Sequence, residues 1–214
     1  MIHPNTELKF VNNEIGNGVF ATEFIPKGTI LYVKDEFEIE VSKSRFNKMG
    51  KLHRDIIEKY SYMDERGVRV LSWDNAKYIN HRCDCNSMST AYGFEIAIRD
   101  ISADEEITDE YGMFNIPESV KISCGCSNCR QMLLPTDIDN NYKAWDVLVK
   151  DAIEHINHVD QPLWDILDDV TKNDLMGFLL SQDEYRSVIN LKHNNLTKKS
   201  PDKISGNQNN THAA

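Results

Sequence analysis

The sequence lacks the features of membrane proteins, secreted proteins and general nucleic-acid-binding proteins. It has no apolar run of about 18 residues, which a membrane-spanning helix needs. Its start, MIHPNTELKF, has neither the basic nor the apolar region of a secretory signal. The formal net charge of −10 at pH 7 excludes the basic surface that phosphate-driven binding requires. We therefore expect a soluble intracellular protein, cytoplasmic or nuclear, that binds basic partners, contacts no nucleic acid or membrane, and is a monomer or weak dimer.

Cysteine is scarce and odd in number, so a disulfide framework is not expected. The five residues are Cys83, Cys85, Cys124, Cys126 and Cys129. Their C-x-C and C-x-C-x-x-C spacings suit a tetrahedral thiolate site, which predicts one structural zinc. The last three cysteines supply three ligands, and either Cys83 or Cys85 supplies the fourth. The alternatives are two ligands from each segment, or unrelated thiols buried as small apolar side chains.

The first half of the chain reads as short strands with one helical insert. Residues 8–41 alternate apolar and polar residues or carry β-branched and aromatic ones, as do 67–73 and 90–101. Between them, residues 43–62 have helical spacing, which Gly50 is expected to interrupt. Within the strand regions, the segment EITDEYG ends in Tyr111.

The second half is predicted to be irregular and then helical. Residues 116–134 have no periodicity, whereas 142–156 place Trp145, Leu148, Val149, Ala152, Ile153 and Ile156 on one helical face. Further helices are expected near 162–170 and 172–190, with a capping box at Ser181–Glu184 marking a helix start. The predicted divisions are 7–115, 116–134 and 135–191, followed by a polar, disordered tail at 192–214.

Two further motifs are weak when each is taken alone. GNGVFA, from Gly16, is a glycine loop without the spacing of a dinucleotide fingerprint or a P-loop. Tyr111 could be an ordinary core aromatic. The order of all the motifs along the chain is more specific than any one of them. That order is GNGVFATEFIPKGTIL, KYINHRCDCN, DEEITDEYG and CGCSNCR.

That order, over about residues 7–131, resembles the SET domain, the fold of most protein-lysine methyltransferases. The C-x-C-x-x-C segment is similar to the zinc-binding post-SET segment of one subfamily. The resemblance implies an α+β, β-rich fold of several small β-sheets with a pseudo-knot, in which the Tyr111 segment threads past the loop of Asn80 and His81. A zinc-bound post-SET loop at 116–134 and C-terminal helices would follow.

The resemblance also implies a reaction, namely methyl transfer from S-adenosylmethionine to a lysine amine in a histone-like or ribosomal-type basic protein. Tyr111 would be the catalytic residue, orienting the amine and the sulfonium. The implied cofactor-binding residues are Gly16, Asn17, Gly18, Asn80, His81 and Tyr111. The implied zinc ligands are Cys83, Cys124, Cys126 and Cys129. Acidic residues around Tyr111, from Asp104 to Glu110, are expected to attract a basic substrate.

Three positions depart from the family pattern, which usually has Ser at Arg82, Pro at Cys85 and, in many members, Phe or Tyr at Asp109. A carboxylate at Asp109 would hold lysine as ammonium and oppose catalysis unless it pointed away from the lysine channel. The alternatives are therefore a catalytically silent SET module that binds basic peptides, or a zinc-stapled adaptor. Channel aromatics could come from Tyr32, Tyr62, Tyr78 or Tyr92.

Overall fold

The described part of the chain forms short strands in four small sheets, with one pair of helices inserted between β4 and β5 and further helices after the last strand. The structure is a computed structural model that describes residues 1–193. The strands are β1 (Thr6–Asn12), β2 (Gly16–Ala21), β3 (Ile30–Val33), β4 (Ile39–Val41), β5 (Ser61–Met63), β6 (Arg69–Leu71), β7 (Asn80–His81), β8 (Ser87–Ser89), β9 (Phe94–Ala97), β10 (Glu106–Asp109), β11 (Val120–Lys121) and β12 (Met132–Leu133). The α-helices are α1 (Lys43–Lys48), α2 (Lys51–Tyr60), α3 (Asp137–Glu154) and α4 (Asp169–Leu179). Short 3-10 turns cover Asn75–Tyr78, Tyr111–Met113, Ile156–His158, Trp164–Ile166 and Val188–Leu191.

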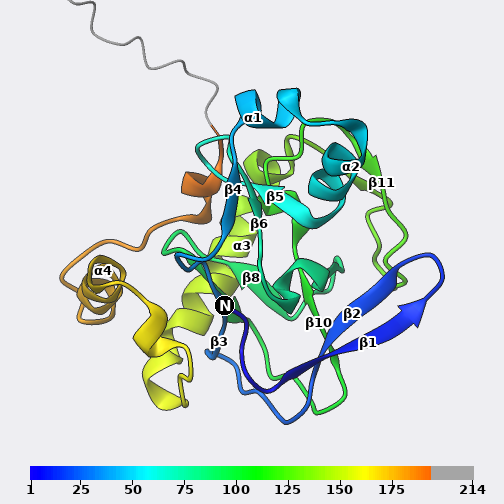
Figure 1. Cartoon of the computed structure of the whole chain (residues 1–214). Helices are drawn as coiled ribbons and strands as arrows, with labels where there is room; N and C mark the ends of the chain where they lie inside the picture. The colour runs from blue at the N-terminus through cyan, green and yellow to red at the C-terminus, as the bar shows by residue number, and fades with distance from the viewer. Residues whose placement is uncertain (194–214) are drawn as a thin grey trace, which may run out of the picture.

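The sheets have the orders β1-β2-β10-β7, β3-β9-β8, β4-β6-β5 and β11-β12. Figure 1 shows α1 and α2 together at one end of the molecule and the β1–β2 hairpin at another, with α4 set apart from both. Gly50 separates α1 from α2 and is the residue before the first turn of α2, as its place in the sequence predicted. Among residues 1–193, no helix is long and apolar enough to cross a membrane.

The strand β10 lies at the centre of the first sheet and determines where Tyr111 sits. It pairs antiparallel with β2 and parallel with β7, so it joins three segments that are distant in sequence. The loop after β7 is bonded to it twice. The amide of Arg82 donates to Asp109, and the amide of Asn86 donates to Thr108. Thus the segment before Tyr111 is bonded to both arms of the 80–86 loop, as the predicted crossing requires.

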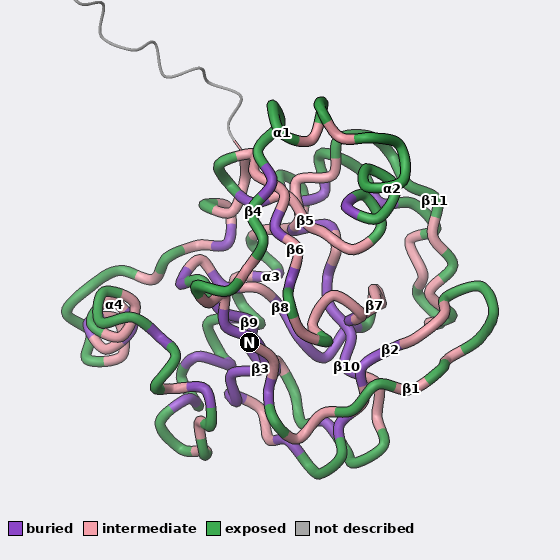
Figure 2. Tube along the Cα trace, in the orientation of Figure 1, coloured by how far each residue is buried: buried purple, intermediate pink, exposed green. Residues whose placement is uncertain are grey.

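Two groups of buried side chains form the core. One contains Ile30, Phe94 and Ile96 of the β3-β9-β8 sheet packed against Trp145, Val149, Ala152 and Ile153 of α3. The other lies under β2 and β10 and includes Val19, Leu31 and Ile107. Figure 2 shows the buried positions concentrated along β3, β9, β10 and α3, whereas α1 and α2 are mostly exposed. On the predicted face of α3, Leu148 is the exception, because it is 40% exposed.

Two predicted elements differ in the structure. Within the strand-like region 8–41, the β-branched and aromatic stretch 29–41 is not continuous but is divided into β3 and β4, because Asp35 accepts the N–H of Phe37 at 2.8 Å and turns the chain. The helix expected over 172–190 ends at Leu179, and the predicted start at Ser181 is wrong. Ser181 instead follows the end of α4 with a φ of 57°. Asp168 caps the start of α4 by accepting the N–H of Thr171 at 2.7 Å. The predicted tail lies outside the described residues from 194 onwards.

Candidate functional site

The glycine loop before and within β2 is shaped by close approach of other side chains. Gly16 has a φ of 89°, a conformation that favours glycine. A Cβ at Gly18 would lie 2.3 Å from Oε1 of Glu106 and 2.9 Å from Nδ2 of Asn80. Glycine at position 18 therefore lets β2 approach both residues closely.

Asn80 holds this loop against the rest of the sheet. Its side-chain amide donates to the carbonyl oxygen of Asn17 at 3.1 Å and to Oε1 of Glu106 at 2.8 Å. Both N–H groups of the side chain thus bind the protein itself. Its amide oxygen is the part of the side chain that could still accept a hydrogen bond from a ligand.

The side chain of His81 is enclosed, and its ring contacts the backbone of Asp109 and Tyr111, the residues on either side of Glu110. Its side chain is 6% exposed. The ring atom Nδ1 lies 3.0 Å from the carbonyl oxygen of Asp109 and 3.2 Å from the amide of Tyr111. Burial lowers the pKa of His81 to about 4, so the imidazole is neutral at pH 7. Its other ring nitrogen, Nε2, lies 3.4 Å from the sulfur of Cys83.

Tyr111 is fixed by its hydroxyl and by its ring. The hydroxyl donates to the carbonyl oxygen of Ile79 at 2.6 Å. The ring centroid lies 5.4 Å from that of His81 and 5.6 Å from that of Phe114. Burial raises the pKa of Tyr111 above its ordinary value of 10.0, and the charges of Asp109 and Glu95 add to this effect. The hydroxyl is therefore neutral and acts as a hydrogen-bond donor, not as a base.

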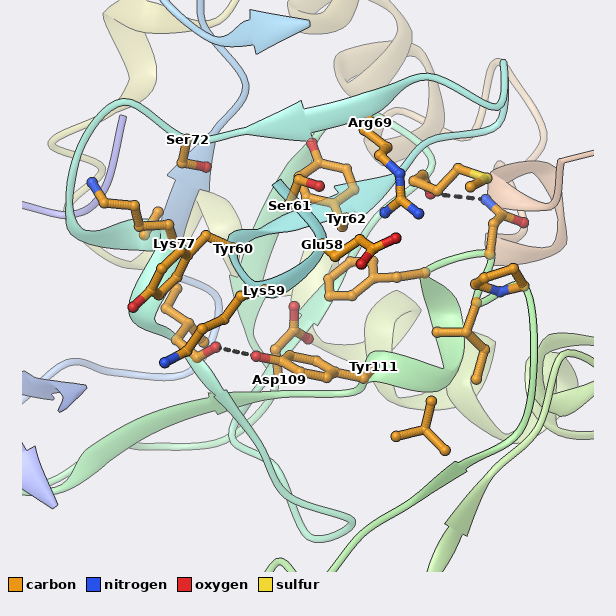
Figure 3. Close-up of a pocket in the computed structure, with 18 of the residues that line it drawn as sticks. Glu58, Lys59, Tyr60, Ser61, Tyr62, Arg69, Ser72, Lys77, Asp109 and Tyr111 are labelled. Carbon is orange, nitrogen blue, oxygen red and sulfur yellow. Dashed lines mark hydrogen bonds between the residues drawn. The ribbon is translucent and has the colours of Figure 1, made fainter. Parts of the chain in front are cut away.

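A cavity of about 420 Å³ opens beside Tyr111. Of the predicted cofactor-binding residues, Tyr111 is the one that lines it. Figure 3 shows the carboxylate of Asp109 beside the ring of Tyr111 and directed into this cavity. Of the tyrosines that could line a channel, Tyr32 and Tyr62 do so. Tyr78 packs on Tyr60, and Tyr92 is buried in the main core.

The thiol cluster consists of Cys83, Cys124, Cys126 and Cys129, and it lies on the far side of His81 from Tyr111. The sulfurs of Cys124 and Cys126 are 3.3 Å apart, and the side chains of Cys83 and Cys129 also interact with Cys124. The ligating atoms of His81, Cys83 and Cys124 all lie within 4.8 Å of one another. Within the described residues, Cys126 and Cys129 lie outside this close group, although both side chains interact with Cys124. Thiols and an imidazole are donors that zinc accepts.

The backbone around the thiol cluster supports the same interpretation. The amide of Arg130 donates to the sulfur of Cys83, and the amide of Gln131 donates to that of Cys129, both at 3.4 Å. Such amide donors orient metal-bound thiolates. Cys85 does not belong to this cluster. It is buried in the main core, and burial raises the pKa of its thiol above the ordinary range.

Comparison with known proteins identifies the central part of the chain. Residues 16–112 match the family model described as SET domain. The several small β-sheets with C-terminal helices are the SET-domain fold that the sequence predicted. The matched segment contains the glycine loop, Asn80, His81 and Tyr111, and it ends before Cys124.

One relative and one solved structure extend the comparison. The chain is 31% identical over 132 residues to the Drosophila melanogaster histone-lysine N-methyltransferase trr, covering 55% of this chain but 5% of that protein. A crystal structure assigned as a histone methyltransferase of Plasmodium falciparum is 18% identical, with a TM-score of 0.38, and covers 51% of this chain and 95% of that one.

Arg130 joins the SET domain to the segment that carries the thiol cluster. Its guanidinium forms a short ion pair with Glu110 and lies 3.7 Å from the carboxylate of Asp137 at the start of α3. The side chains of Glu110 and Asp137 are 3% and 7% exposed. A residue that follows the last cysteine of the cluster is therefore bonded next to Tyr111. Sequence reasoning missed this arginine.

The acidic residues around Tyr111 do not form the free acidic surface that the sequence suggested. Asp104 pairs with Lys9, and Glu105 pairs with Arg99. Glu110 is buried and pairs with Arg130, and Glu106 binds Asn80. Asp104, Glu105 and Glu110 thus have basic partners within the protein, whereas Glu106 keeps its charge beside the neutral amide of Asn80. Asp109 is different, because it is buried at the cavity.

Proposed function

We propose that this protein is a lysine methyltransferase that transfers a methyl group from S-adenosylmethionine to a lysine side chain of a basic protein. The observation that carries the proposal is the placement of Tyr111. In a SET domain, its hydroxyl is held in place at a cavity wide enough for an extended side chain. The similarity to the Drosophila histone-lysine N-methyltransferase supports the substrate class.

The donor set of the glycine loop, Asn80 and His81 fits S-adenosylmethionine at the edge of the same sheet. The cofactor would supply a methyl group activated on a sulfonium. Gly16 leaves its backbone groups open to a ligand, since nothing lies within 4 Å of where its Cβ would be, and Gly18 lets Asn80 approach the same strand. Asn80 would bind through its free amide oxygen. His81 would bind through its backbone, because its ring is enclosed. Tyr111 would complete the site.

The residues of this protein must keep the lysine amine neutral and direct its lone pair towards the methyl group of the cofactor. A free lysine has a pKa near 10.4, so keeping it unprotonated at pH 7 costs roughly 4.6 kcal/mol. Tyr111 cannot take the proton because its own pKa is raised. Its role is to orient the amine by a hydrogen bond, and most of the acceleration would come from such positioning.

Zinc bound by Cys83, Cys124, Cys126 and Cys129 would be structural. All four positions would be thiolates, which leaves no open place for water or substrate. The ion would hold the segment 116–134 against the loop that carries Asn80 and His81, since Cys83 belongs to that loop.

Methyl transfer from labelled S-adenosylmethionine to a mixture of basic proteins tests the proposal. Tyr111→Phe removes the hydroxyl and should reduce transfer about 100-fold to 1,000-fold, the usual effect of losing one such donor. Tyr142→Phe, on α3, is the matched control and should transfer normally. Equal rates for wild type and Tyr111→Phe would contradict the assignment of Tyr111.

The buried carboxylate of Asp109 favours one other candidate, a silent SET module that binds basic peptides without modifying them. A carboxylate attracts an ammonium whether or not chemistry follows. Binding of both S-adenosylmethionine and a basic protein without transfer would support this second function. Absence of cofactor binding would leave the zinc-stapled adaptor.

A further inference from the structure

Two acidic side chains from different sheets meet at the cavity beside Tyr111. Glu95 lies on β9, where it is the cross-strand neighbour of Tyr32 on β3 and of Ser89 on β8. Asp109 ends β10, two residues before Tyr111. Both line the cavity, although Glu95 is only 8% exposed and Asp109 only 1%. Neither is needed to form the glycine loop or the thiol cluster.

Each carboxyl group has one oxygen without a hydrogen-bond partner. Oδ1 of Asp109 accepts the amide of Glu110 at 2.7 Å, but its Oδ2 has no donor among residues 1–193. The same holds within the described chain for Oε2 of Glu95. The two carboxyl groups are within hydrogen-bond reach of each other. Buried acceptors of this kind are rare without a proton or a cation to satisfy them.

No basic group among residues 1–193 forms an ion pair with Glu95 or Asp109. The groups that act on it are Glu38, Cys85, Glu110, Tyr62, Tyr111 and the amino group of Met1. The Met1 amino group is itself paired with Asp35, and Glu110 is paired with Arg130. Charged residues that line the same cavity are Glu58, Lys59, Arg69, Lys77 and Glu118. Burial raises the pKa of both Glu95 and Asp109. Glu95 raises the pKa of Asp109 further, whereas a hydrogen bond with Asp109 lowers the pKa of Glu95, so the two carboxyl groups favour sharing one proton.

The walls around the pair suit an alkyl chain that ends in a positive charge. Tyr32, Tyr62, Tyr111 and Phe114 line the cavity. The ring centroids of Tyr62 and Phe114 are 5.1 Å apart, which makes a continuous aromatic surface with Tyr111. Aromatic faces attract cations and pack well against methylene groups.

We propose that the carboxyl pair of Glu95 and Asp109 receives the ammonium group of the methyl-accepting lysine and takes the proton that this group loses. This inference rests on the proposed function. It adds a group that accepts the proton of the lysine ammonium, a role that Tyr111 cannot fill. Glu95 also lines a second cavity of about 270 Å³, which gives the pair another route for proton exchange with solvent.

The proton and charge balance is simple. The lysine ammonium gives one proton to the singly charged pair, which leaves a neutral amine and a neutral pair of carboxylic acids. The amine lone pair then forms the N–C bond as the C–S bond of the sulfonium breaks, and sulfur keeps that electron pair. The products are a methylated ammonium and a neutral thioether, and the pair later returns its proton to solvent. The carboxylate at 109 would therefore assist catalysis.

The first test measures binding without cofactor or substrate protein. The probe is n-butylammonium, which has the same chain and charge as the end of a lysine side chain, and 1-butanol is its neutral counterpart. Carbon-13 NMR of the Glu95 and Asp109 carboxyl groups, assigned from Glu95→Gln and Asp109→Asn, reports the contact. Butylammonium should shift both signals and bind at least tenfold more tightly than butanol, and each variant should lose that preference.

Glu118→Gln, at the same cavity, is the matched control and should keep the preference for butylammonium. The two pair variants are close in size to the native residues, and their melting curves show whether they fold. Equal binding of butanol and butylammonium, or unchanged selectivity in the folded variants, would overturn the proposal.

The second test measures the pH dependence of methyl transfer. The wild type should reach a plateau once the pair is singly charged. In Glu95→Gln the rate should keep rising about tenfold per pH unit towards the pKa of free lysine, with at least a tenfold deficit at pH 7 that nearly disappears above pH 9.5. A purely structural role would lower the rate equally at every pH. Charge-selective binding without any transfer would reject the proposed function but not the receptor, whereas transfer with identical pH profiles would reject only the proton acceptor.

Discussion

The residues around Tyr111 and the thiol cluster lie next to each other, but different interactions hold them in place. Asn80, His81 and Tyr111 all have hydrogen-bond partners within the protein and are carried by the β1-β2-β10-β7 sheet. Three of the thiols lie between the two-residue strands β11 and β12, and Cys83 follows β7. Their contacts are mainly with each other and with backbone amides. The first region is therefore ordered by the fold, whereas we expect the second to become rigid when it binds the proposed zinc. Arg130 connects the two regions, because it follows Cys129 in the chain and its guanidinium pairs with Glu110, the residue before Tyr111.

The largest effect should come from removing one thiol of the cluster. Cys124→Ser removes the sulfur that all other cluster members contact, and one ligand of four contributes about 3 kcal/mol of a typical zinc affinity. We expect about one zinc per wild-type chain and nearly none in the variant after dialysis against a chelator, measured by atomic emission. Methyl transfer should be lost with the metal.

Cys85→Ser is the matched control for that experiment. Its thiol is buried in the core and does not belong to the cluster, so zinc should stay near one per chain. A loss of zinc in Cys85→Ser and its retention in Cys124→Ser would exchange the roles of the two cysteines.

The next largest effect should come from breaking the connection between the two regions. Arg130→Gln leaves Glu110 and Asp137 buried without their cation, and removal of one partner of a buried ion pair costs about 3 kcal/mol. Urea unfolding should show this loss. Arg82→Gln removes an arginine whose partner, Asp84, is 54% exposed, and should change stability little. Equal losses for the two variants would show that Arg130 is not the connection.

Sequence motifs predicted much of the site because each motif is local. In a short motif, the residue types and their spacing already indicate the local geometry. This holds for the glycine loop, the Asn80–His81 pair, Tyr111 and the C-x-C-x-x-C segment. The ion pairs of Arg130 were not predictable in this way. Its partners lie 20 residues before it and seven after it, and only the path of the chain between β10 and α3 brings them together.

Glu95 was missed for a different physical reason. Within FEIA, alternation would place the polar residue on a solvent face. However, β9 is the central strand of its sheet, and all four of its residues are buried. A central strand covered on both faces loses the alternating pattern on which such a prediction depends. For similar reasons, the end of α4 depended on a left-handed residue at Ser181, which serine does not signal.

A smaller effect is expected at the glycine loop. Gly18→Ala would force apart Glu106 and Asn80, whose side-chain ends can shift, so the cost in stability should be about 1–2 kcal/mol. The larger consequence should be at least tenfold weaker binding of S-adenosylmethionine, measured by calorimetry, because Asn80 loses its place. In Gly50→Ala the added Cβ meets nothing within 4 Å, and binding should be unchanged. Normal cofactor binding by Gly18→Ala would separate the glycine loop from the cofactor site.

The smallest expected effect is on stability, and it tests whether the fold satisfies every group in the region around Tyr111. The tyrosine region contains one element that the fold does not satisfy, the Glu95–Asp109 pair. A buried acid with a raised pKa binds its proton more tightly when folded than when unfolded, so its contribution to stability falls as pH rises from about 4 through the folded pKa. Asp109→Asn should therefore raise stability at pH 8 by about 1 kcal/mol, or roughly 2–4 °C in Tm, and change little at pH 4. Asp104→Asn, whose carboxylate is exposed and paired with Lys9, should give no such rise. If Asp109→Asn were less stable than the wild type at pH 8, the pair would be a satisfied structural element and not a receptor that awaits a charge.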